Sequence, residues 1–365
     1  MTVEPHDGSL AAKADLHVYA GGTYNADTPA HLLDDPITPV SHFFVRNNGD
    51  WPPGLPDDHD DWRFTLDGLV ERPLSLTLRE LKSRFESITV TSVLECAGNG
   101  RGYLDPPVEG VQCAAGAVGC ARFTGFRMAD LLAAAGVGPG AVYTAHYSPD
   151  RTAEGKAAIS RGLPLAKALA PETLLAYAMN GEPLAIAHGG PLRVVAPGFP
   201  GSAWQKWLTR LQIRDVEHDG AKMTGLDYRL PARPLRPGAP LGGAAFLVIE
   251  DMPVKALITY PAANAVLRAG EPCEIRGWAW SGQVSVEKVA LSWDGLEWRE
   301  AALEAAEERW AWRRFRLSWR PTRTGSAVLL ARATDALGRS QPLEQAWNPR
   351  GYCNNACQPV AVAIA

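Results

Sequence analysis

At residues 91–101 the chain reads Thr91-Ser92-Val93-Leu94-Glu95-Cys96-Ala97-Gly98-Asn99-Gly100-Arg101. Apolar and β-branched residues over 88–94 predict a strand, and the Gly/Asn cluster that follows predicts an abrupt turn. Cys96 is therefore expected at a strand tip, beside an arginine and free backbone N–H groups. Such surroundings favour the thiolate, which is a nucleophile and a soft ligand for transition metals. The residues alone leave open a buried structural cysteine, the commoner role of an isolated thiol.

The composition is that of a globular protein with more than one core, because 365 residues exceed the usual size of a single domain. The net charge of −4 gives no reason to expect binding to nucleic acid or to an anionic membrane. No apolar run reaches the ~20 residues of a membrane span. The first residues lack a signal-peptide pattern, so we expect a cytoplasmic protein, or a periplasmic one if a leader has been removed. The scattered cysteines predict no disulfide framework.

The pattern of apolar residues divides the chain into two regions. In the first region we expect a strand over 37–48 and helices over 76–84, 129–135, 165–169 and 171–178. The Pro-rich residues 230–243 predict an extended linker. Beyond it, short alternating runs separated by turn signals predict an all-β sandwich of immunoglobulin size. We therefore expect an α+β protein, with a mixed α/β domain over 1–240 and an Ig-like β-sandwich over 241–365.

Other stretches of the first region carry side chains suited to binding an anion. Arg46 is the residue after the apolar run 43–45, and His188 precedes a Gly-Gly-Pro turn. Arg193 lies within an apolar run that reads as a buried strand. Gly198 and Gly201 bracket a loop in which backbone N–H groups can approach an anionic ligand. Taken singly, Arg46 is equally explained as a solvated arginine at a strand end, and His188 as a core or surface histidine.

Together these stretches resemble the sulfite oxidase family of molybdopterin-dependent oxidoreductases, in its bacterial, haem-free form. The matching motifs are Phe43-Phe44-Val45-Arg46-Asn47, Leu94-Glu95-Cys96-Ala97-Gly98-Asn99, residues 180–195 and 197–208, Asp227-Tyr228, and residues 347–351. They cover essentially the whole chain. The resemblance implies a molybdopterin-binding domain followed by an Ig-like dimerisation domain, a molybdenum–molybdopterin cofactor and a homodimer.

The resemblance also implies roles for single residues. Cys96 would be the thiolate ligand of molybdenum. The oxyanion pocket would be formed by Arg46, Arg101, Tyr228 and Arg313. The pterin and its phosphate would be held by Phe44, Arg46, Asn47, Asn48, Asp150, His188, Arg193, Ser202 and Lys206.

The implied reaction is oxidation of sulfite to sulfate. No haem domain precedes residue 37, so the electrons are expected to pass to an external acceptor, a cytochrome c-like protein or oxygen. Three positions depart from the family pattern: Cys113 stands where a tryptophan is common, and Gly100 and Ala203 stand where arginines are common. These departures leave open a related molybdenum enzyme acting on sulfane sulfur, a sulfoxide or nitrate. A non-enzymatic protein whose sandwich domain binds partners is a further alternative.

Overall fold

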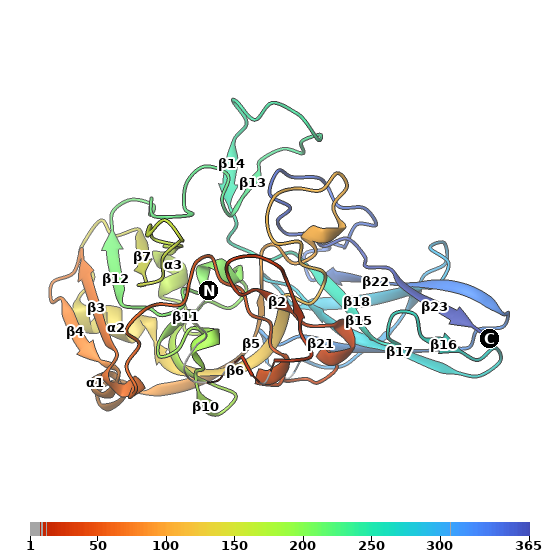
Figure 1. Ribbon diagram of the computed structural model, residues 1–365, viewed down its shortest axis with the longest axis horizontal. Helices are drawn as coiled ribbons and strands as arrows, with labels where there is room; N and C mark the ends of the chain where they lie inside the picture. Colours follow the sequence, from red (N-terminus) through yellow and green to blue (C-terminus); the bar gives the residue numbers. More distant parts are fainter. Residues whose placement is uncertain (1–7, 9, 12, 307) are drawn as a thin grey trace.

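The computed structural model describes residues 8, 10–11, 13–306 and 308–365. Two parts lie side by side along the long axis, with the cyan and blue strands of the last third gathered at one end (Figure 1). Residues 1–7, where a signal-peptide pattern was not found, lie outside the described residues. Within the described residues, no helix has the length and apolar character needed to cross a membrane.

The first part contains two β-sheets of five strands each. One sheet has the order β10-β9-β6-β5, with β11 also paired to β9, and all its pairs are antiparallel. Its strands are β5 (Ser87–Glu95), β6 (Val118–Arg127), β9 (Leu174–Met179), β10 (Glu182–Pro183) and β11 (Arg193–Val195). The other has the order β4-β3-β12-β7-β8, in which only β3 and β12 run parallel. Its strands are β3 (Arg63–Gly68), β4 (Leu74–Thr77), β7 (Tyr143–Tyr147), β8 (Gly162–Pro164) and β12 (Arg210–Arg214).

Short helices and two small hairpins complete the first part. The α-helices are α1 (Leu78–Arg84), α2 (Met128–Ala135) and α3 (Leu165–Ala168). The 3₁₀ helices are η1 (Ala30–Leu33), η2 (Val40–His42), η3 (His59–Asp61), η4 (Arg101–Tyr103), η5 (Ile186–His188) and η6 (Gly201–Ala203). The hairpins pair β1 (His17–Val18) with β2 (Ala26–Asp27), and β13 (Arg229–Pro231) with β14 (Phe246–Val248). Residues 230–243, expected as a plain linker, thus form most of a hairpin that projects from the molecule (Figure 1).

Two expected elements are wrong. Residues 171–178 were expected to be helical, but they lead into strand β9, which pairs with β6 on one side and with β10 and β11 on the other. A strand buried on both faces is a continuous apolar run, and periodicity does not distinguish such a run from a buried helix. Residues 37–48, expected as a strand, contain η2 instead, and among the described residues only Val45 pairs with a strand, through an isolated antiparallel bridge to Ala26 of β2.

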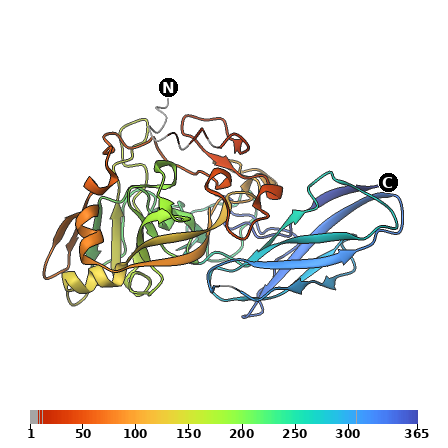
Figure 2. The ribbon, with the colours of Figure 1, turned by 90° about the horizontal axis from the view of Figure 1, so that it is seen from below.

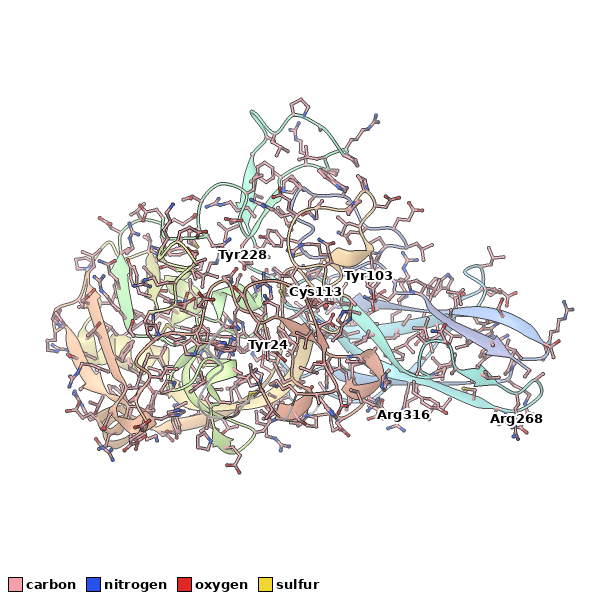
Figure 3. The ribbon with its side chains drawn as sticks, in the orientation of Figure 1. Tyr24, Tyr103, Cys113, Tyr228, Arg268 and Arg316 are labelled. Atoms are coloured by element: carbon pink, nitrogen blue, oxygen red, sulfur yellow. The ribbon has the colours of Figure 1, made fainter. Side chains whose placement is uncertain are left out.

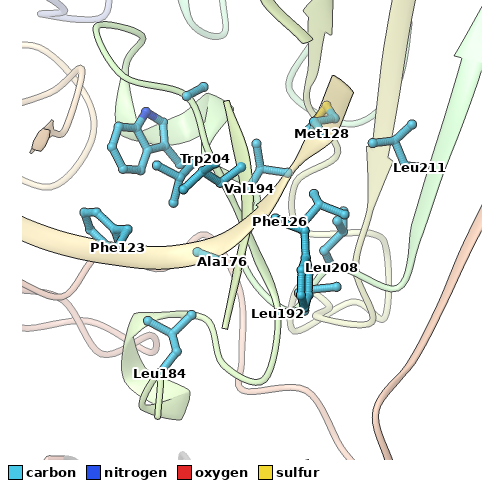
Figure 4. Packing of buried hydrophobic residues seen from close by; sticks show 14 of the residues in the cluster. Phe123, Phe126, Met128, Ala176, Leu184, Leu192, Val194, Trp204, Leu208 and Leu211 are labelled. Carbon is cyan, nitrogen blue, oxygen red and sulfur yellow. The ribbon is translucent and has the colours of Figure 1, made fainter. Parts of the chain in front are cut away.

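The core of the first part forms where the β5–β6 sheet meets the loops that follow it. Phe123 and Phe126 of β6 pack with Ala176 of β9 and with Leu192 and Trp204 (Figure 4). All five side chains are fully buried or nearly so. This packing fixes the carboxyl end of β5, which leads directly to Cys96.

The second part is a sandwich of two sheets, as predicted (Figure 2). The first sheet has the order β15-β17-β21-β20, formed by β15 (Lys255–Tyr260), β17 (Cys273–Trp280), β20 (Ala302–Leu303) and β21 (Arg313–Trp319). The second has the order β16-β23-β22-β18-β19, formed by β16 (Val266–Leu267), β18 (Val286–Ser292), β19 (Arg299–Glu300), β22 (Gly325–Asp335) and β23 (Val360–Ile364). Inward-facing Ile275, Phe315 and Leu329 fill the space between the sheets. The predicted α+β class, with an α/β domain followed by an Ig-like sandwich, is confirmed.

The two parts share a buried boundary. The indole N–H of Trp278 donates to the carbonyl of Leu33 at 2.8 Å, and that of Trp312 donates to the carbonyl of Pro36 at 2.8 Å. Asp34 accepts from Arg276 at 2.7 Å and from Arg314 at 2.6 Å. The sandwich is therefore hydrogen-bonded to the segment around η1 and lies against β5, the strand that leads to Cys96.

Candidate active site

A cavity opens beyond the end of β5. Its wall is assembled from the segment after η2, the end of β5, the β7–β8 loop, η5, β11, η6 and the loop before β13. The residues that line it are Phe44, Arg46, Asn47, Asn48, Leu94, Cys96, Asp150, Ile159, His188, Arg193, Gly201, Ser202, Trp204, Gln205, Lys206, Trp207 and Tyr228. Every residue predicted for the site except Arg101 and Arg313 is among them.

Cys96 sits one residue beyond the strand, as expected from the sequence. Its backbone N–H donates to the carbonyl of Ala117 at 2.9 Å, and the N–H of Gly98 donates to its Sγ at 3.4 Å. The Asn99 amide links Glu95 Oε1 at 2.9 Å to the N–H of Ala117 at 3.1 Å, which ties the turn to β6. Cys96 also lines the cavity, so a metal bound there can reach its Sγ atom.

Three cations converge on the cavity. Arg46 donates to Asn25 Oδ1 at 2.8 Å and also to the carbonyl of Asn47. Arg193 donates to the carbonyls of His188 at 2.6 Å and Trp204 at 3.0 Å, and burial lowers its pKa to about 9. Lys206 Nζ donates to Asn47 Oδ1 at 2.7 Å, and burial lowers its pKa well below the ordinary value.

None of these three cations forms an ion pair with a carboxylate in the part of the chain that the structure describes. Buried charges are normally paired, because desolvating an isolated charge is costly. Two further polar atoms of the wall, His188 Nε2 and Ser202 Oγ, are buried with no hydrogen-bond partner among the described residues. The arrangement is that of a site completed by a bound anion.

Tyr228 closes the cavity on the side of the C-terminal part. It adopts a left-handed backbone conformation, with φ of 51°, and its hydroxyl donates to Asn48 Oδ1 at 3.2 Å. Burial raises the pKa of Tyr228, so the phenol is neutral and can donate a hydrogen bond. Burial likewise raises the pKa of Asp150, whose carboxylate accepts from the Ser148 hydroxyl.

Arg101 and Arg313 lie elsewhere. The guanidinium of Arg101 donates to the carbonyls of Val111 at 2.9 Å and Arg350 at 2.8 Å, behind the wall. Arg313 donates to the carbonyls of Glu304 at 2.9 Å and Val286 within the sandwich, and it does not line this cavity. Successive side chains of a strand point to opposite faces, and on β21 it is Arg314 that turns toward the first part, where it binds Asp34.

Cys113, which stands where a tryptophan is common in the family, lies outside the set of residues that line the cavity. It belongs to the core cluster that also contains Cys96 and is 3% exposed. Burial, with a smaller effect of the nearby Cys96, raises the pKa of Cys113 to about 12, so this thiol stays protonated. The cavity is also lined by residues that the sequence did not predict, among them Trp204, Gln205 and Trp207. They flank Lys206, which was predicted.

Family models match both parts of the chain. The oxidoreductase molybdopterin binding domain matches residues 51–222, and the Mo-co oxidoreductase dimerisation domain matches residues 247–365. They define the class as a molybdopterin-dependent oxidoreductase.

Similar proteins of known family place the chain more closely within this class of oxidoreductase. The mitochondrial sulfite oxidase of Rattus norvegicus is 33% identical over 99% of this chain and 68% of that protein. The sulfite oxidase of Arabidopsis thaliana is 30% identical over 96% of this chain and 94% of that protein. The chain belongs to the sulfite oxidase family.

Two other relatives have names that denote different activities. The crystal structure of the sulfane dehydrogenase SoxCD from Paracoccus pantotrophus matches with a TM-score of 0.79 and 29% identity, over 98% of this chain and 90% of that chain. A nitrate reductase of Aspergillus niger is 28% identical over 96% of this chain and 44% of that protein.

The cofactor of this family is molybdenum–molybdopterin, and the residues of the cavity fit it. Cys96 offers a thiolate to the metal. Unpaired Arg193 and Lys206, with the partnerless His188 Nε2 and Ser202 Oγ, offer donors to an anionic pterin phosphate. Among the described residues, no group of three or more His, Cys, Asp or Glu side chains is placed to hold a metal ion. Cys96 would thus supply the protein's bond to a metal that the cofactor otherwise carries.

Proposed function

We propose that this protein oxidises sulfite to sulfate and passes the two electrons to an external acceptor. The observation that carries the proposal is the group of cations without carboxylate partners gathered around a thiol at a strand tip. The similarity to sulfite oxidases over nearly the whole chain supports the same substrate.

Sulfite is a compact dianion with a lone pair on sulfur, and the cavity offers it fixed donors. Arg46 presents a guanidinium already held by Asn25 and Asn47, so little side-chain entropy is lost when it binds an oxyanion. Each charge-assisted hydrogen bond contributes on the order of 1.5–3 kcal/mol. The neutral phenol of Tyr228, beside Asn48, offers a further donor to an oxygen atom of the substrate.

The bound cofactor supplies the oxygen-atom transfer and accepts two electrons, so that sulfite and water become sulfate, two protons and two electrons. The chain's own contribution is to bind and orient. Cys96 would hold the metal, and Arg46 and Tyr228 would bind and orient the oxyanion beside it. Trp204 and Trp207 contribute apolar surface that limits water in the cavity.

The sandwich domain supports a second proposal, a homodimer, because its family model is that of a dimerisation domain. The acceptor is proposed to be a cytochrome c-like protein or oxygen.

A test requires protein expressed in a host that makes the cofactor. We expect about one molybdenum per chain by elemental analysis, and sulfite-dependent reduction of ferricyanide and cytochrome c. Molybdenum-loaded protein that leaves every acceptor oxidised in the presence of sulfite would contradict the proposal.

Sulfane oxidation is the alternative with a specific observation behind it. The fold of the sulfane dehydrogenase matches this chain over almost its full length. Turnover on sulfite and on thiosulfate, measured with the same loaded protein and acceptor, separates the two: a higher kcat/KM for thiosulfate would replace sulfite as the substrate.

A further inference from the structure

Arg161 is a buried cation for which the site described above has no role. It lies directly before β8, and its side chain is among the largest fully buried ones, with 1% exposed. One guanidinium nitrogen donates to the carbonyl of Lys222 at 2.7 Å. Its Nε is buried with no hydrogen-bond partner among the described residues, and no described carboxylate forms an ion pair with it.

Arg161 stands directly behind the wall of the cavity. Its guanidinium carbon is 4.9 Å from the centre of the Tyr228 ring. Its backbone N–H donates to Oε1 of Gln205 at 3.1 Å. Tyr228 and Gln205 both line the cavity, as does Ile159, two residues earlier in the chain. Arg161 is therefore one side chain removed from the space in which the oxyanion would bind.

Tyr228 is held in a stack of planar groups. Its ring lies parallel to that of Tyr352, with the centres 5.2 Å apart and the planes at 18°. The guanidinium of Arg101 lies 5.3 Å from the centre of the Tyr352 ring. The stack thus consists of Arg161, Tyr228, Tyr352 and Arg101, in that order. Tyr228 itself lies near the middle of the molecule, close to the junction of the two parts (Figure 3).

The cost of burying the unpaired charge of Arg161 points to a role beyond packing. Desolvation of an unpaired cation is costly, and the contact with the electron-rich face of Tyr228 offsets only part of that cost. Arginine stays charged even where burial lowers its pKa, as it does here. A bond to the carbonyl of Lys222 alone would not require a charge. An anion in the cavity would supply the missing compensation, because a charge in a water-poor interior acts over several ångströms.

We propose that Arg161 is a positioning residue of the oxyanion pocket, which holds Tyr228 in place and adds the positive potential that favours a doubly charged oxyanion. The identity of that anion as sulfite or sulfate rests on the proposed function. The role of Arg161 toward an anion rests on its burial and its contact with Tyr228.

The test compares neutral and charged replacements in cofactor-loaded protein. Arg161→Gln keeps a donor for the Lys222 carbonyl but removes the charge, Arg161→Met is a second neutral variant, and Arg161→Lys restores the charge. The matched control is Arg210→Met, because Arg210 also lies 4.9 Å from a tyrosine ring, that of Tyr147, but pairs with Asp67 at the surface. Molybdenum content is measured for each variant.

We expect the KM for sulfite and the inhibition constant for sulfate to rise roughly tenfold in both neutral variants, while kcat changes less than about threefold. Arg161→Lys should recover most of the loss, and Arg210→Met should match the wild type. A binding measurement independent of turnover is the rise of the thermal midpoint of loaded protein with added sulfate, which should be smaller in the neutral variants.

Neutral variants that fold, carry molybdenum and keep wild-type KM and sulfate response would overturn the role of Arg161. So would a loss of equal size in Arg210→Met. If the wild type does not oxidise sulfite, the proposed function fails, but the sulfate response of wild type and variants still decides the role of Arg161. A wild type that neither oxidises sulfite nor responds to sulfate would overturn both.

Discussion

Lys255 of the sandwich forms a buried ion pair with Glu95, the residue before Cys96, with Nζ 2.8 Å from Oε1. The side chains are 4% and 2% exposed. Trp280 of the sandwich donates its indole N–H to the other carboxylate oxygen at 2.7 Å. The second domain thus fixes the backbone that presents the proposed metal ligand.

Removal of Lys255 should therefore weaken both the fold and the site. Lys255→Met leaves a buried carboxylate without its cation, which should cost about 3–5 kcal/mol of unfolding free energy in a urea titration. The double variant Glu95→Gln/Lys255→Met removes both charges and should regain most of that loss. If the single and double variants are equally stable, the ion pair does not hold the strand end. Molybdenum content of the single variant reports whether the cysteine turn has moved.

Cys96→Ser tests the metal ligand. The hydroxyl is a poor substitute for a soft thiolate, so we expect turnover to fall more than about 100-fold. The protein should stay folded, since serine fills nearly the same volume and the turn is held by Asn99. Cys113→Ser is the matched control, because that thiol is buried in the same core but lies outside the cavity wall. Wild-type turnover in Cys96→Ser would remove this residue from the metal.

Arg46→Gln tests the anion contact within the cavity. Loss of a charge-assisted hydrogen bond worth about 1.5–3 kcal/mol should raise the KM for sulfite roughly 10- to 150-fold. Glutamine can still donate to Asn25, so the local loop should be preserved. The check is steady-state kinetics with molybdenum content determined for both proteins. An unchanged KM at full loading would mean that Arg46 does not touch the substrate.

Much of the site was predictable because its residues recur in short motifs. Cys96, His188 and Arg193 stand close to turn or glycine signals, and the resemblance gave roles to them and to Lys206. Long-range partners carry no such signal. Nothing in the sequence around Lys255 indicates that it pairs with Glu95, and Arg161 reads as an ordinary residue between Ser160 and Gly162.

The errors have physical causes of the same kind. The Leu/Ala-rich run before Asn180 favours a helix locally, but pairing on both sides makes it a strand. Arg313 and Arg314 are adjacent in sequence, and only the register of β21 with β17 decides which one faces the first domain.

Acid should loosen the junction of the two parts through Asp34. Burial alone would raise the pKa of Asp34, but hydrogen bonds from Arg276, Thr259 and Arg314 outweigh it and hold the pKa below the ordinary 3.8. Because the folded pKa is the lower one, the stabilisation is fully present well above pH 3.8 and is lost as the pH falls through that value toward the folded pKa. Asp34→Asn should be less stable at pH 7, with the difference from wild type narrowing between about pH 5 and pH 3.

Thermal midpoints of wild type and Asp34→Asn across that pH range provide the measurement. The control is Asp219→Asn, because Asp219 is an exposed carboxylate paired with Arg214. A gap between wild type and Asp34→Asn that stays constant down to pH 3 would show that protonation of Asp34 does not govern the junction.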